Sequence, residues 1–156
     1  MGYLSTFQAG ELEARKLARR LISEEIPVAE STKTKGEIEA AISEAIVHFE
    51  IDYMGRGPKE ARSYIVDDLI LVRLKGMLTP AEQQLTKTVE GVELIKRMRS
   101  TIIDNARAEF SRVVANVTGA PVRDILTDIS TDTGERVFVF ILDRNLSKEL
   151  PRRMNP

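Results

Sequence analysis

Apolar residues recur at helical spacing from Ile38 to Phe49, three and four positions apart, which places them on one face of a helix. Thr34 precedes this segment, and Glu37 follows Thr34 by three positions. That pair is typical of a capping box, in which each side chain accepts the other residue's backbone N–H. We therefore expect a helix that begins after Thr34 and ends at Gly55, because glycine adopts the left-handed conformation that terminates helices.

Polar residues occupy the other side of this predicted helix, and we expect them to face solvent: Glu37, Glu39, Ser43, Glu44 and Glu50. His48, the only histidine of the chain, lies beside the apolar face. No second histidine and no cysteine is available to share a metal ion with it. The sequence therefore favours an exposed or partly packed His48 over a functional one.

A second helical pattern extends from Pro80 to about Thr118. Thr79 and Glu82 form another capping box, with proline at the first helical position. Gly91 is a possible interruption, since glycine within a helix costs about 1 kcal/mol relative to alanine. The apolar stripe is broken once, at Arg99, and its members are Val92, Ile95, Ile102, Ala106, Phe110, Val113 and Val117, widened by Met98, Ile103 and Val114.

Lys96, Arg97 and Arg99 form a short basic cluster on this second pattern. A solvated helix face explains the cluster, and an anion site is the alternative. Gly119, followed by Pro121, is expected to end the helix.

Two pairs of short β-branched and aliphatic runs predict two hairpins. The first joins 61–66 to 69–75 through Asp67 and Asp68, and the second joins 123–129 to 136–142 through a turn at Gly134. On 69–75 one face is apolar and the other becomes basic toward its end. The run 136–142 is apolar on both faces, which predicts a strand covered on both sides or near the sheet centre.

Together these patterns predict an α+β fold with the order helix, β-hairpin, long helical region, β-hairpin. We expect a four-stranded antiparallel sheet with helices packed on it. The expected domain spans residues 35–143, after an N-terminal helical extension and linker at 1–34. A polar tail at 144–156 is expected to fray.

The N-terminal extension carries a helical apolar stripe formed by Phe7, Ala14, Leu17, Ala18 and Leu21. Basic residues flank this stripe. We expect it to pack on the domain or on another subunit, and attachment to a membrane surface is the alternative. Four glutamates in the same segment weaken the membrane interpretation, because they would repel anionic lipid.

The charge balance argues against nucleic acid as a partner, since 23 basic residues face 24 acidic ones. The chain has no cysteine, which excludes disulfides, thiolate metal sites and cysteine nucleophiles. No apolar run approaches the roughly 20 residues needed to span a bilayer. A cytoplasmic location is expected, with peripheral membrane association as the alternative.

Candidate chemistry is limited to basic residues around the first hairpin. Gly55 and Gly57 flank Arg56, and their backbone N–H groups could face an anion, although the sequence favours a plain turn. The candidate anion-binding residues are Arg56, Lys59, Arg62, Arg73 and Lys75. No nucleophile–base–acid set, P-loop or paired metal motif occurs. No metal and no cofactor is predicted, and catalytic residues stay undefined.

The segments GRGP, VRLKGMLTPAE and TDISTDTGERVFVF together resemble the bacterial MpsC-like family, over about residues 35–143. The family name refers to a Na⁺-translocating, membrane-potential-generating system, which has also been connected with inorganic-carbon uptake. The resemblance implies a soluble accessory of a membrane complex and supplies no catalytic residues. It also marks polar positions besides Arg56 and Arg73, namely Thr79, Glu82, Asp128, Thr131 and Glu135.

Two function hypotheses follow from these observations. The first is a non-enzymatic accessory or regulatory protein of a membrane ion or inorganic-carbon transport system, which the resemblance implies. The alternative is a small-anion or nucleotide-phosphate binding domain, or a weak enzyme, which the basic residues suggest. A homo-oligomer is expected in either case, because a long helix or the N-terminal helix could pair with a second copy.

Overall fold

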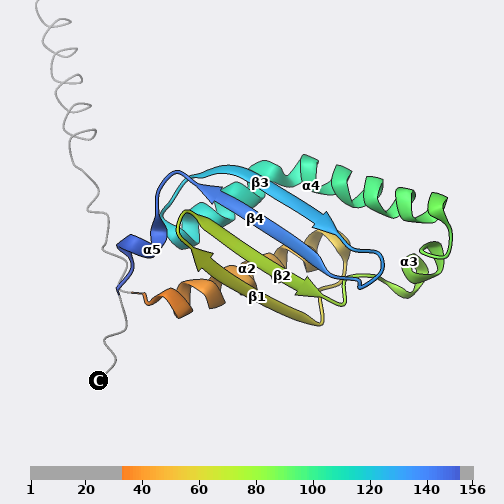
Figure 1. Ribbon diagram of the computed structural model, residues 1–156, viewed down its shortest axis with the longest axis horizontal. Helices are drawn as coiled ribbons and strands as arrows, with labels where there is room; N and C mark the ends of the chain where they lie inside the picture. The colour runs from red at the N-terminus through yellow and green to blue at the C-terminus, as the bar shows by residue number, and fades with distance from the viewer. Residues whose placement is uncertain (1–32, 152–156) are drawn as a thin grey trace, which may run out of the picture. The chain divides into compact units, whose positions relative to one another are not determined.

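Four antiparallel strands in the order β1-β2-β4-β3 form the sheet of this protein (Figure 1). The computed structural model describes residues 33–151. Its elements are α2 (Lys35–Met54), β1 (Glu60–Val66), β2 (Leu69–Lys75), α3 (Pro80–Leu85), α4 (Val89–Thr118), β3 (Val122–Ile129), β4 (Arg136–Leu142) and α5 (Leu146–Glu149). The predicted α+β class, with its four-stranded antiparallel sheet, is confirmed.

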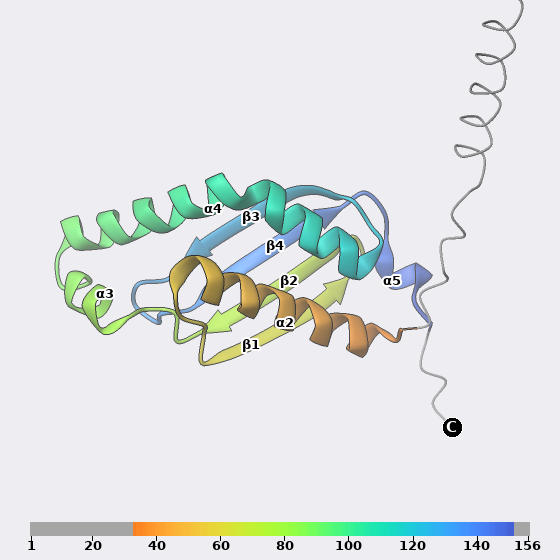
Figure 2. The ribbon, with the colours of Figure 1, turned by 180° about the vertical axis from the view of Figure 1, so that it is seen from behind.

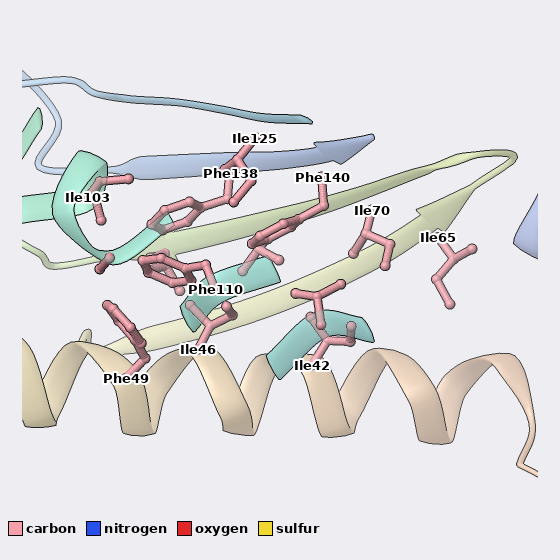
Figure 3. Packing of buried hydrophobic residues seen from close by; sticks show 14 of the residues in the cluster. Ile42, Ile46, Phe49, Ile65, Ile70, Ile103, Phe110, Ile125, Phe138 and Phe140 are labelled. Atoms are coloured by element: carbon pink, nitrogen blue, oxygen red, sulfur yellow. The ribbon is translucent and has the colours of Figure 1, made fainter. Parts of the chain in front are cut away.

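Helices α2 and α4 lie side by side on one face of the sheet (Figure 2). The ring of Phe110 on α4 lies between α2 and the sheet and is tilted against both neighbouring rings. Its centroid is 3.7 Å from that of Phe49 and 5.1 Å from that of Phe138 (Figure 3). Apolar side chains from α2, α4 and alternate positions of all four strands complete this core. Burial of this apolar area is the main force that holds helices and sheet together.

The helix boundaries follow the predicted caps. Thr34 and Thr79 each accept the backbone N–H of the glutamate three residues on, and each glutamate accepts the threonine N–H. Gly55 and Gly119 both end their helices with φ near +70°. These contacts are made within a few residues, which is why the sequence alone could indicate them.

The long helical region is divided differently from the prediction. The break between α3 and α4 lies at residues 86–88 rather than at Gly91. Gly91 lies in the first turn of α4, where it packs on the end of α3. A Cβ atom at this position would lie 1.8 Å from the carbonyl oxygen of Leu85. Gly91 therefore permits a close contact between two helices and does not interrupt one.

Three expectations about exposure are wrong. Glu50 was expected to face solvent but is 1% exposed, and Arg99 was expected in a solvated cluster but is 2% exposed. In the stripe of α4, the flanking members Ile103 and Val114 are buried as expected, whereas the expected central members Ile102 and Val113 are only half-buried. At the C-terminus, the expected fraying does not begin at residue 144, because α5 forms there and buries Leu146.

The second hairpin and the central position of β4 match the sequence analysis. Gly134 turns the chain at φ 70°, and β4 lies between β2 and β3. The predicted helix over residues 7–21 lies outside the described residues, and the assigned domain boundaries stay a prediction.

Carboxylates accept backbone N–H groups on both outer strands of the sheet. On β1, Glu39 of α2 accepts the N–H of Ile65 at 2.8 Å. On β3, Asp124 and Asp128 each accept the N–H of the residue that follows, at 2.8 Å. These amides thus have acceptors that do not belong to a neighbouring strand.

Candidate functional site

The sheet face opposite the helices carries a belt of partly exposed apolar side chains, which we call the open face. Its most exposed members, with 37–54% of their surface accessible, are Tyr64, Val66, Leu126 and Val137. Leu69, Leu71, Val139 and Ile141 lie between them and are half-buried. An antiparallel sheet commonly presents a polar surface on its uncovered face. A broad apolar belt there is typical of an interaction surface.

Strand register arranges the open face in three cross-strand rows. The central row reads Tyr64–Leu71–Val139–Leu126, from β1 to β3. The row on one side reads Arg62–Arg73–Val137–Asp128, and the row on the other side reads Val66–Leu69–Ile141–Asp124. The face is therefore basic at one end of its β1–β2 side, apolar in the middle, and acidic at both ends of its β3 side.

A hollow of about 260 Å³ lies at the basic side of the open face, lined by Glu60, Arg62, Tyr64, Arg73 and Lys75. Glu60 pairs with Lys75 at 3.3 Å and with Arg62 at 3.1 Å. The Lys75 ammonium, followed by the Arg62 guanidinium, holds the pKa of Glu60 below its ordinary value. The hollow thus presents basic side chains that are partly neutralised by a carboxylate.

Three of the five candidate anion-binding residues meet in this hollow: Arg62, Arg73 and Lys75. The structure places Arg56 elsewhere, where its guanidinium donates to the carbonyl oxygens of Leu78 and Gly76. Lys59 is exposed and its aliphatic stem packs against Gly76. Arg56 therefore holds the loop after β2, and Lys59 lies outside the hollow.

The other polar positions that the family resemblance singled out also lie in different parts of the structure. Glu135 pairs with Arg73 at 2.7 Å beside the hollow, and Asp128 pairs with Lys96 at 3.3 Å on the acidic side. Thr131 lies in the turn between β3 and β4. Thr79 and Glu82 cap α3, and Glu82 has a second partner in the interior.

That second partner is Arg99, and the pair is almost completely buried. The Arg99 guanidinium donates two hydrogen bonds of 2.9 Å to the Glu82 carboxylate and a third to the carbonyl oxygen of Met77. Burial alone would raise the pKa of Glu82, but the hydrogen bonds from Arg99 and Thr79 outweigh it and keep the pKa below its ordinary value. The pair fastens α3 and the loop before it to the middle of α4.

Glu50 and Arg136 extend this group of buried charges. Burial raises the pKa of Glu50, although the positive charges of Arg136 and Arg99 oppose the shift. Arg136 donates to the hydroxyl of Thr127 and lies 4.9 Å from the centre of the Phe138 ring. Because the folded pKa of Glu50 is raised, its contribution to stability is present at acid pH and lost as pH rises through that pKa.

This group of buried charges was not predicted from the sequence, although two of its residues occupy telling positions. Arg99 occupies a position of the apolar stripe, and Glu82 is the third residue of a capping box, where its carboxylate is held in place. Their partnership required knowledge of how α3 folds back on α4.

Helix α3 and the start of α4 extend past the end of the sheet (Figures 1 and 2). We call α3 together with residues 86–98 the arm. Four apolar side chains of the arm are 40–73% exposed: Leu85, Val89, Leu94 and Met98. Glu82, Arg99 and Gly91 fix the corner of the arm from within. The arm is therefore a segment whose corner is held by buried contacts and whose surface carries apolar side chains.

Metal sites and membrane spans are absent from residues 33–151. No group of three histidine, cysteine, aspartate or glutamate side chains there is placed to hold a metal ion. Within the same residues, no helix combines the length and the apolar character that a bilayer span requires. His48 is exposed in the structure, 3.8 Å from Glu44.

The fold and its surfaces define an α+β protein with two helices on one side of a four-stranded sheet and an open face on the other. Residues 34–144 match the family described as Na⁺-translocating membrane potential-generating system (MpsC). The chain belongs to this family, which confirms the resemblance noted in its sequence.

Two relatives come from Bacillus subtilis (strain 168). The uncharacterized protein YbcI is 41% identical over 120 residues, which cover 77% of this chain and 97% of the relative. The uncharacterized protein YrhF is 24% identical over 99 residues, 63% of this chain and 81% of the relative. No solved structure matches the chain.

Proposed function

We propose that this chain is a non-enzymatic accessory or regulatory protein of a membrane ion or inorganic-carbon transport system. The family description supports the kind of system, because it refers to Na⁺ translocation and a membrane potential. The structural observation that carries the proposal is the arm, which begins past the end of the sheet (Figure 1) and carries exposed apolar side chains. A segment whose corner is held by buried contacts suits docking to another protein, since less order has to be gained on binding.

The test is affinity purification of the tagged full-length protein from gently solubilised native cells, followed by mass spectrometry. We expect a membrane transport component in stoichiometric amount. Lysine at both Leu94 and Met98 should abolish its recovery, because charge is costly to bury in an apolar contact. The matched control is Glu93→Lys, which makes the same change of net charge at an exposed polar position of the same helix. It should leave recovery unchanged.

An eluate that contains only the tagged protein would contradict the proposal. Equal recovery by the Leu94 and Met98 variant and by the wild type would place the contact elsewhere and overturn the role of the arm.

We propose as a second candidate that the basic hollow binds a small anion such as phosphate or bicarbonate. The convergence of Arg62, Arg73 and Lys75 supports this function, while Glu60 and Glu135 compete for the same cations. Calorimetric titration with phosphate should release heat with the wild type and with Lys59→Ala, whose side chain lies outside the hollow. Arg73→Ala should lose the signal, and absence of heat with the wild type would exclude phosphate.

A further inference from the structure

We infer that the open face is a homodimer interface, in which two copies pack face to face about a two-fold axis parallel to the strands. The inference is independent of the proposed accessory role. The apolar belt explains why the face should be covered, because burial of apolar area drives association. The distribution of charge across the face explains why a second copy fits it.

The strand order determines what a second copy would present. An axis parallel to the strands, between β2 and β4, places β1 over β3 of the second copy and β2 over its β4. Each cross-strand row then faces its own reverse. In the central row, Tyr64 faces Leu126 of the second copy, and Leu71 faces its Val139. Aligned sheets pack about 10 Å apart, at about 30°, a distance that these side chains fill.

The charged row is also complementary under this axis. Arg62 at the basic side faces Asp128 at the acidic side of the second copy, and the reverse contact occurs at the other end. The hollow formed by Arg62, Arg73 and Lys75 would thus receive a carboxylate. Arg62 and Asp128 have 68% and 73% of their side-chain surfaces exposed, and their present partners are also accessible. Such exposed pairs exchange at little cost.

An axis perpendicular to the strands gives a worse match. It would place Asp128 over Asp124 of the second copy and Arg62 over its Val66. Two carboxylates facing each other repel, and the apolar side chain leaves the arginine without a partner. With the parallel axis, the poor matches are Val66 opposite Asp124 and Arg73 opposite Val137, and Arg73 keeps Glu135 of its own chain as a partner. Charge complementarity therefore selects one of the two simple arrangements.

The first experiment measures self-association of the full chain by sedimentation equilibrium across a range of concentrations. We expect a concentration-dependent dimer. Arg62→Asp and Asp128→Arg should each weaken the dimer about tenfold, which corresponds to about 1.4 kcal/mol. An equimolar mixture of the two variants should recover the wild-type affinity, because every Asp–Arg contact is then restored between unlike copies.

Recovery by mixing separates an interface from a folding defect, since neither variant changes when the other is added. Lys87→Asp is the matched control. It makes the same change of charge as Arg62→Asp at an exposed position away from the open face, and it should leave the dimer intact. A monomer at all concentrations, as expected if residues 1–32 or another protein covers the face, would overturn the inference. Failure of the mixture to recover affinity would overturn it as well.

Cross-linking tests the axis directly, because the chain has no native cysteine. Tyr64→Cys and Leu126→Cys variants, mixed and treated with a short bismaleimide, should give a covalent dimer of one copy of each. Either variant alone should give little product. Preferential linkage of Tyr64→Cys to itself would exclude an axis parallel to the strands.

Discussion

Replacement of Arg99 by methionine should lower the free energy of unfolding by about 3–5 kcal/mol, the cost of removing one partner of a buried ion pair. Methionine fills a similar length of the interior and is compatible with a helix. The loss therefore arises from the Glu82 carboxylate, which stays buried with Thr79 as its remaining partner. Urea denaturation at pH 7 measures the change.

The pH dependence of this loss gives a second readout. Glu82 has a lowered pKa in the folded wild type, so its stabilising contribution is present above the unfolded pKa and lost as pH falls through the folded one. Arg99→Met removes the main cause of that shift. The difference between variant and wild type should therefore be largest near pH 7 and decrease as acid protonates Glu82.

Arg97→Met is the matched control for Arg99→Met, since it removes an exposed guanidinium two residues away on the same helix. It should change the free energy of unfolding by no more than about 0.5 kcal/mol. Adding Glu82→Gln to Arg99→Met should recover part of the loss, because the amide oxygen can still accept the Thr79 N–H without carrying a charge. A loss below about 1 kcal/mol for Arg99→Met would show that the pair does not hold α3 to α4.

Gly91→Ala should destabilise the protein by about 1–3 kcal/mol, although alanine is the better helix former. The new Cβ would overlap the carbonyl of Leu85, which belongs to the backbone and cannot rotate away. The end of α3 has to move, and with it the corner of the arm. Urea denaturation measures the total cost, and faster amide hydrogen exchange in α3 would locate it.

Gly36→Ala is the control for the glycine substitution. Gly36 is also in the first turn of a helix, α2, and a Cβ atom there meets nothing within 4 Å. This variant should gain about 0.4–1 kcal/mol, because alanine loses less conformational freedom on folding. Effects of the same sign and size at Gly36 and Gly91 would contradict the role of the close contact with Leu85.

Local chemistry explains which parts of the fold the sequence could predict. The capping boxes at Thr34 and Thr79 join residues three positions apart, and the strands of each hairpin are neighbours in the chain. The pairing of β2 with β4 joins segments more than sixty residues apart. That pairing depends on how the helices cover the sheet, so the strand order had no local signal.

The residues of the candidate site also fall into those that local patterns could place and those that they could not. The alternation along β2 correctly indicated that Arg73 and Lys75 share one face. Arg56 is also basic and close in sequence, but its turn directs it to the carbonyl oxygens of Leu78 and Gly76. The sequence could not predict that Asp128 lies on the same face as Arg62 and Arg73, because this depends on the position of β3 at the far edge of the sheet.

The backbone N–H groups of β1 and β3 that donate to carboxylates limit the size of the assemblies this protein can form. An edge strand with free N–H groups can recruit further strands without limit and so form fibrils. Here Glu39 accepts a hydrogen bond from the N–H of Ile65 on β1. On β3, Asp124 and Asp128 each accept one from the N–H of the next residue. Growth by strand addition is therefore disfavoured at both edges. A two-fold contact through the open face would close at two copies, because each copy uses the same surface. Neither route would leave an end for a polymer.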